Sequence, residues 1–79
     1  MEPSRLGAIP LFAGLTDREL EILRALAKGL SNHAISGEFW ITEQTVKFHL
    51  TNIYRKLGVS NRTEATHYAC SHGLVETYA

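Results

Sequence analysis

The stretch LSNHAISGEFWITEQTVKFHLTNIYRKLG, residues 30–58, holds two helical patterns joined by a very short connection. In its second half, apolar residues recur at the spacing i, i+4, i+7 and i+11, namely Val46, Leu50, Ile53 and Leu57. This spacing gathers them into one narrow stripe along an α-helix. Thr42 precedes the stripe as a favourable N-cap, and Gly58 follows it as a favourable helix end. The pattern predicts a helix over residues 43–57.

A shorter helix is predicted just before it, over residues 32–39. Ser31 is a favourable N-cap, and the residues expected on the inner side are Ala34, Ile35 and Phe39. Because only residues 40–42 separate the two helices, they must form a tight, angled pair, which is a helix-turn-helix over about residues 30–49. Gly37 costs about 1 kcal/mol relative to alanine inside a helix, so we expect this helix to be the least stable.

Two further helices flank the pair. The capping box Thr16–Glu19 opens a helix predicted over residues 17–28. A second candidate capping box, Asn61–Glu64, opens a helix predicted over residues 62–71, whose inward residues are expected to be Ala65, Tyr68 and Ala69. No segment has the alternating pattern of a strand. The predicted fold class is therefore all-α, a compact four-helix domain over residues 15–75.

Length and composition limit the class of protein further. A chain of 79 residues has room for one core, and its 44% apolar content favours a globular fold. No apolar run approaches the roughly 20 residues of a membrane span, and no secretory signal is present. Cys70 is the only cysteine, which excludes an internal disulfide and favours a cytoplasmic location. Residues 1–14 have no periodic pattern and are interpreted as a tail or the remnant of a linker.

The distribution of charge is more informative than its sum. A formal net charge of zero argues against a nucleic-acid partner, because proteins that bind nucleic acid are usually basic. Residues 42–62, however, contain one acid, Glu43, and four fixed cations, Lys47, Arg55, Lys56 and Arg62. An ordinary solvated helix face would intersperse acids with these bases. The balanced total therefore hides a basic segment on the longest predicted helix.

The outer face of that helix has the chemistry of a DNA-reading surface. Amides, hydroxyls and apolar groups read base edges, whereas cations hold the phosphates on either side. Phe48 points away from the apolar stripe, where a thymine methyl could cover it; packing on a neighbour within the domain is the alternative. The residues expected at base edges are Lys47, Phe48, Thr51 and Gln44. Those expected to position the DNA backbone are Thr42, Asn32, His49, Arg55 and Lys56.

Several separate motifs in order resemble the LuxR-type DNA-binding domain. They are LTDRE at residues 15–19, AKGLSN at 27–32, ITEQTVKFHL at 41–50, RKLGV at 55–59 and RTEA at 62–65. The resemblance covers about residues 14–74. It implies a four-helix domain that regulates bacterial transcription, with the third helix in the major groove of double-stranded DNA. It also implies a place at the C-terminal end of a response regulator or ligand-sensing activator, although a stand-alone regulator is open as well.

The same resemblance suggests roles for single residues. Lys47 stands where the family has a lysine that meets DNA. Thr51 stands where some members have a second lysine, and His33 stands where lysine is frequent, so both positions lack a cation that relatives carry. The fourth helix often forms a homodimer contact in the family, and the surface residues expected to serve it here are Thr63, Thr66, His67 and Cys70.

The sequence leaves other classes of function open. One alternative is a helical protein-interaction module, which would use the fourth helix alone. Another is a sigma-factor-like promoter-recognition domain, which would work with RNA polymerase. RNA polymerase is also a candidate partner if the protein is a regulator of transcription. An enzyme is the weakest reading, since Asp17 is the only aspartate and lies in a capping turn. His67 and His72 diverge on a helix and a fourth ligand is missing, so no metal and no cofactor is expected.

Overall fold

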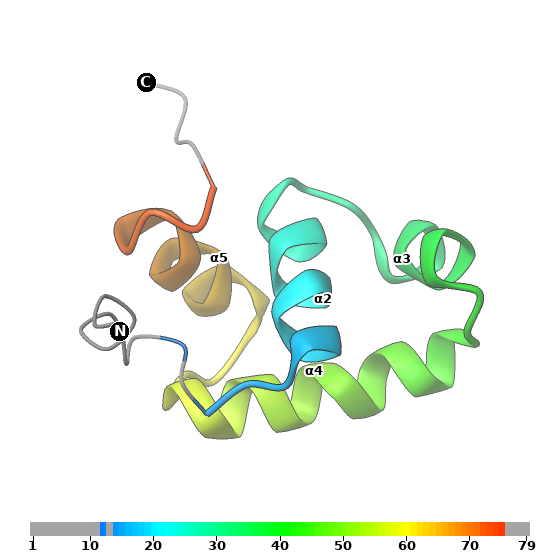
Figure 1. Ribbon diagram of the computed structural model, residues 1–79, viewed down its shortest axis with the longest axis horizontal. Coiled ribbons are helices and arrows are strands. Elements are labelled where there is room, and N and C mark those ends of the chain that lie inside the picture. The colour runs from blue at the N-terminus through cyan, green and yellow to red at the C-terminus, as the bar shows by residue number, and fades with distance from the viewer. Residues whose placement is uncertain (1–11, 13, 76–79) are drawn as a thin grey trace, which may run out of the picture.

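The computed structural model describes residues 12 and 14–75 and contains four helices in this range (Figure 1). They are α2 (Asp17–Ala27), α3 (Asn32–Phe39), α4 (Glu43–Leu57) and α5 (Arg62–Ser71). No strand occurs among the described residues, so the all-α prediction is confirmed, with α2 ending one residue early. None of the described helices is long and apolar enough to cross a membrane.

All four helices begin at the predicted N-cap residues. The side-chain oxygens of Thr16, Ser31, Thr42 and Asn61 each accept a hydrogen bond from the backbone N–H three residues on, at 2.9–3.0 Å. The box at α2 is reciprocal, because the Thr16 N–H donates to Glu19 at 3.0 Å. The second predicted box is only half formed. The Glu64 carboxylate accepts from the Ser60 N–H, at 2.7 Å, instead of from that of the N-cap.

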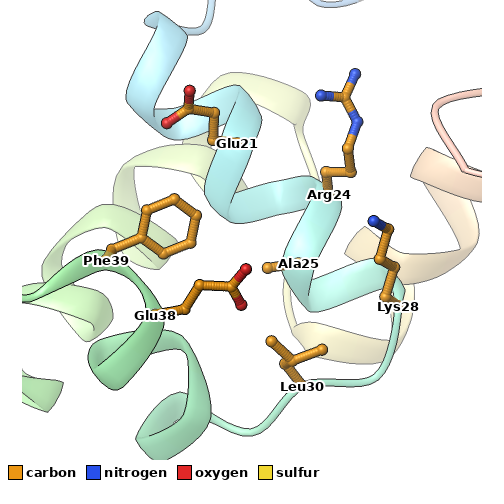
Figure 2. Close-up of a pocket in the computed structure, with 7 residues that line it drawn as sticks. All are labelled: Glu21, Arg24, Ala25, Lys28, Leu30, Glu38 and Phe39. Atoms are coloured by element: carbon orange, nitrogen blue, oxygen red, sulfur yellow. The ribbon is translucent and has the colours of Figure 1, made fainter.

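Helix α2 lies at the centre and contacts the other three helices, and α3 also packs on α4 (Figure 1). A shallow groove remains between α2 and α3, with Glu38 and Phe39 on one side and Arg24 and Lys28 on the other (Figure 2). Phe12, within the predicted tail, has its ring edge-on to Tyr68 of α5 at 5.8 Å between centroids. The other residues of the predicted tail, apart from Gly14, lie outside the described residues.

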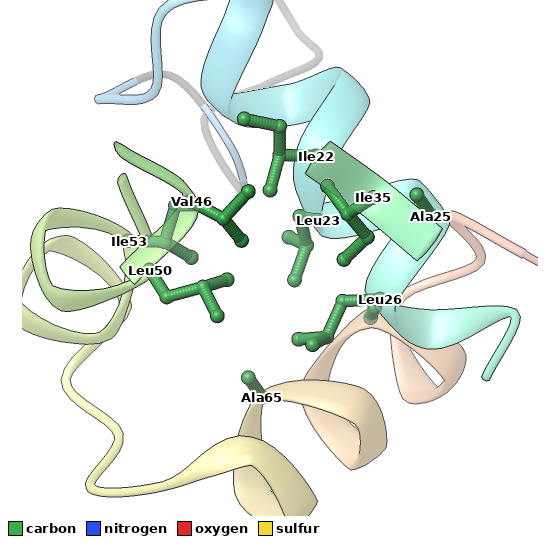
Figure 3. Packing of buried hydrophobic residues seen from close by; sticks show 10 residues of the cluster. Ile22, Leu23, Ala25, Leu26, Ile35, Val46, Leu50, Ile53 and Ala65 are labelled. Carbon is green, nitrogen blue, oxygen red and sulfur yellow. The ribbon is translucent and has the colours of Figure 1, made fainter. Parts of the chain in front are cut away.

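The core lies where α2, α3, α4 and α5 meet (Figure 3). Val46, Leu50 and Ile53 of α4 are buried as predicted, and the fourth member of the stripe, Leu57, is half-buried against the cluster. The remaining buried apolar residues are Ile22, Leu23, Ala25, Leu26, Ile35, Ala65 and Ala69. Because its apolar stripe is buried against the other helices, the side of α4 opposite the stripe stays open.

Two inward predictions were wrong or only partly right. Ala34 is exposed while its neighbour Ile35 is fully buried. The buried residues of this eight-residue helix are Ile35 and Ser36, so its contact with the core lies on the side of Ile35 away from Ala34. Tyr68, also expected inward, is half-buried at the edge of α5, whereas Ala65 and Ala69 reach the core.

Two helices end in the left-handed conformation, with different residues. Gly58 ends α4 with φ 75° and ψ 29°, as its lack of a Cβ favours. Trp40 ends α3 with φ 58° and ψ 41°, and it is the only non-glycine residue with positive φ in the described part of the chain. That conformation costs roughly 1–2 kcal/mol for a residue with a Cβ. From the sequence alone, Trp40 is expected only to be part of the connection between α3 and α4.

Candidate nucleic-acid interface

The outer face of α4 is open, as the sequence predicted. Gln44, Lys47, Phe48, Thr51 and Arg55 are exposed, while the opposite stripe is buried in the core. In Figure 1, α2, α3 and α5 all lie on one side of α4, and its other side borders no described helix. The face is therefore accessible along the whole helix, which is the geometry that entry into a groove requires.

Phe48 keeps 63% of its surface exposed. Its ring also meets the His49 ring of the same helix, with the centroids 5.9 Å apart and the planes at 62°. The ring therefore has a neighbour within the domain and still presents most of its surface, and its contact with a thymine methyl stays a prediction. A large exposed apolar side chain is unfavourable in water unless a partner covers it.

Hydrogen bonds already orient several polar groups of this face. The Thr51 hydroxyl donates to the Lys47 carbonyl oxygen at 3.0 Å, so it presents its lone pairs and methyl group outward. Arg55 donates from Nη2 to Asn52 Oδ1 at 2.8 Å. The Thr42 hydroxyl caps α4 and donates to Thr45 Oγ1 at 2.9 Å, which leaves no free O–H for a phosphate.

Lys56 lies at the far end of α4 and is bound within the domain. Its Nζ is 2.8 Å from Oε1 of Glu19, a residue only 4% exposed. Burial raises the pKa of the Glu19 carboxyl, but hydrogen bonds from Lys56 and Thr16 and the positive charge of Lys56 lower it more, so the pKa lies below its usual value. The contact of Lys56 with the DNA backbone stays a prediction. Its ammonium group already has a buried partner within the domain.

A hydrogen-bonded pair joins the N-terminal ends of α3 and α4. Nδ1 of His33 is 2.9 Å from Oε2 of Glu43, with both side chains largely exposed. Glu43 is the one acid of the basic segment, so this contact places a hydrogen-bond partner on the residue least compatible with DNA. Sequence reasoning missed the pair, because the two residues lie on different helices and neither is in a capping position that links them.

Asn32 and Arg62 also meet, although only Asn32 was a predicted site residue. Arg62 Nη2 donates to Asn32 Oδ1 at 2.5 Å, and Nη1 donates to the Leu30 carbonyl oxygen at 3.1 Å. These bonds tie the first residue of α5 to the first residue of α3 and to the loop before it. The amide nitrogen of Asn32 stays available to a phosphate, while the cation of Arg62 is engaged inside the domain.

The four residues of the predicted dimer surface come together on α5. Thr63, Thr66, His67 and Cys70 line one shallow hollow with the end of α2. His72 does not join His67 and Cys70: its Nδ1 lies 2.8 Å from the Tyr68 carbonyl oxygen. Within residues 12 and 14–75, no group of three or more His, Cys, Asp or Glu side chains is placed to hold a metal ion.

Comparison with known proteins gives the family. The family described as "Bacterial regulatory proteins, luxR family" matches residues 13–69. The response regulator proteins VraR of Staphylococcus aureus, Staphylococcus saprophyticus and Staphylococcus epidermidis are each 48% identical over 66 residues, which is 84% of this chain and 32% of theirs.

A solved structure agrees with these sequence matches. The crystal structure of the response regulator ChrA, from a heme-sensing two-component system, is 43% identical with a TM-score of 0.72 and covers 91% of this chain and 35% of that one. The chain thus spans about a third of the length of the relatives it matches. It belongs to the luxR family of bacterial regulatory proteins, which are DNA-binding regulators of transcription.

Proposed function

We propose that this chain binds double-stranded DNA in a sequence-specific manner by placing α4 in the major groove. The observation that carries the proposal is the open outer face of α4, on which Lys47 and the largely exposed Phe48 stand opposite a stripe whose first three residues are buried. A helix fits the width of the major groove of B-DNA, and this one presents amide, hydroxyl, apolar and cationic groups there.

The residues divide by their chemistry and position. Lys47, Phe48, Thr51 and Gln44 stand at the middle of the exposed face and are assigned to base edges. Contacts with the DNA backbone are assigned to Arg55, His49, Thr42 and the amide nitrogen of Asn32. Lys56 is left out of the assignment because its ammonium is paired with Glu19. Thr42 acts through the N-terminal end of α4, because its hydroxyl is already used.

A homodimer on DNA is part of the proposal. The hollow lined by Thr63, Thr66, His67 and Cys70 gives α5 an apolar and partly polar surface that two copies can share. Two domains would then read half-sites about one helical turn apart. The protein is placed in the cytoplasm with its DNA, and RNA polymerase is the further partner expected of a regulator of transcription.

The test uses duplexes that the chain selects from a random pool. Lys47→Ala is expected to weaken binding of a selected duplex about tenfold. If Lys47 also neutralises a phosphate, the slope of log affinity against log salt falls by roughly 0.9. Lys28→Ala, which removes an exposed lysine at the end of α2, is the matched control and should bind as the wild type does. Equal affinities of wild type and Lys47→Ala would contradict the proposal.

Phe48→Ala separates base reading from general attraction to DNA. It should change which duplexes are selected while leaving the affinity for unrelated duplexes nearly unchanged, because an apolar contact with a thymine methyl exists only at certain bases. Equal losses on all duplexes would place Phe48 outside the base-reading surface.

A further inference from the structure

Trp40 combines two unfavourable features that the fold does not explain. Its backbone is left-handed, with φ 58°, in the helix-ending position that glycine occupies at the end of α4. Its side chain is 92% exposed and is absent from the apolar cluster. Among residues 12 and 14–75, no group accepts a hydrogen bond from its indole nitrogen. Such a combination points to a use outside the folded domain itself.

The position of Trp40 relates it to the proposed DNA surface. Only one residue separates it from Thr42, the N-cap of α4, so the two Cα atoms are at most about 7.6 Å apart. With α4 in a major groove, the turn before its N-terminus lies beside a phosphate strand that borders the groove. An indole there offers an apolar face to a deoxyribose and an N–H donor to a phosphate oxygen.

The surroundings of Trp40 favour DNA over a protein partner. Protein interfaces surround an aromatic anchor with further buried contacts. The apolar residues that flank Trp40, Phe39 and Ile41, are instead packed against the core of the domain, and the exposed residues Gly37, Glu38 and Thr42 are small or polar. Two carboxylates belong to residues close to Trp40 in the sequence, and each lies in another environment. Glu43 is paired with His33, and Glu38 points into the groove toward α2 (Figure 2).

We propose that Trp40 is a DNA-backbone contact that extends the interface of α4 across the helix-turn-helix connection. The inference rests on the proposed function. It adds a neutral, sequence-independent contact: the indole N–H donates to a phosphate oxygen while the ring covers the adjoining sugar. Such a contact releases no counterion, so it strengthens binding without adding to the salt dependence.

The chain has a single tryptophan, so tryptophan fluorescence reports on Trp40 alone. The 79-residue chain is titrated with a mixed-sequence duplex at low salt, and binding is followed independently by the anisotropy of a label on the duplex. Emission is expected to change with the same midpoint as the anisotropy, and quenching by acrylamide is expected to fall. Unchanged emission and quenching on a bound duplex would overturn the inference and leave the indole to a protein partner.

Two variants give the second readout. Trp40→Gly removes the indole and suits the left-handed backbone, so we expect a higher melting temperature together with affinity about tenfold weaker on every duplex. Its salt slope should equal that of the wild type, in contrast to Lys47→Ala. Trp40→Phe keeps an aromatic ring without the N–H, so its affinity for DNA should lie between those of the wild type and Trp40→Gly. Wild-type affinity in Trp40→Gly contradicts the inference, and absence of any DNA binding by the wild type contradicts the proposed function itself.

Discussion

Two pairs of side chains hold opposite ends of α4, and their contact distances are almost the same. Lys56 and Glu19 are 2.8 Å apart at the C-terminal end, and His33 and Glu43 are 2.9 Å apart at the N-terminal end. Their surroundings differ greatly, because Glu19 is 4% exposed while the His33 side chain is 86% exposed. The comparison teaches that burial, and not distance, decides how much each pair contributes to the stability of the fold.

The physical reason is the cost of leaving a charge behind. Removing one partner of a buried pair strands a carboxylate in a medium that solvates it poorly, at about 3–5 kcal/mol. In an exposed pair, water replaces the lost partner, and the net contribution is about 0–1 kcal/mol. Glu19 also accepts the Thr16 N–H, so its pair links the start of α2 to the end of α4, whereas the pair at His33 borders the proposed DNA surface and can open at little cost.

The largest expected effect is that of Lys56→Ala. It leaves Glu19 buried without its cation, and the free energy of unfolding should fall by about 3 kcal/mol, as measured by urea denaturation. Lys28→Ala removes an exposed lysine that makes no ion pair with a described residue. This control should change the free energy of unfolding by less than about 0.5 kcal/mol. Equal values for both variants would mean that the pair at Glu19 contributes no more than a surface contact.

The next effect is a loss of stability in acid. The pKa of Glu19 lies below the usual value of 4.5, so its ionised form stabilises the folded state above that value. This stabilisation is lost as the pH falls below 4.5 and through the lower pKa of the folded state. Chemical denaturation at a series of pH values should show the decline in the wild type and a smaller one in Glu19→Gln. A decline of the same size in the wild type and in Glu19→Gln would mean that other carboxylates cause the loss of stability in acid.

The smallest effect is expected for His33→Ala. Because both partners are largely exposed, the free energy of unfolding at neutral pH should change by no more than about 0.5 kcal/mol. Urea denaturation of the wild type and of His33→Ala measures this change in the free energy of unfolding. A loss comparable to that of Lys56→Ala would show that the two pairs do not differ in the way their burial implies.

Much of the fold could be predicted because it depends on residues that are close in sequence. Thr16, Ser31, Thr42 and Asn61 begin the helices through bonds to the N–H three residues on, and the stripe on α4 depends on spacing alone. The error at Ala34 arose in the shortest helix, where periodicity is a weak signal; Ile35 is buried as predicted, but its buried neighbour is Ser36 and not Ala34.

The candidate site was predictable to a lesser extent. The open face of α4 follows from the position of its apolar stripe, so Lys47 and Phe48 could be named from the sequence. Whether the remaining polar and charged groups are available to DNA could not be predicted from the sequence. Lys56 was expected at the DNA backbone, but its partner Glu19 lies 37 residues away, and no local pattern links the two.

The sequence by itself determined where the helices begin and which side of α4 turns outward, since hydrogen bonds and side-chain spacing within one helix decide both. Only the tertiary structure decided which charges stay free to meet a partner and which are paired inside the domain. It also decided that Trp40 would take a left-handed conformation and extend into solvent. These outcomes depend on how α3 meets α4 and how α2 crosses it, and such contacts exist only after residues distant in the chain have packed together.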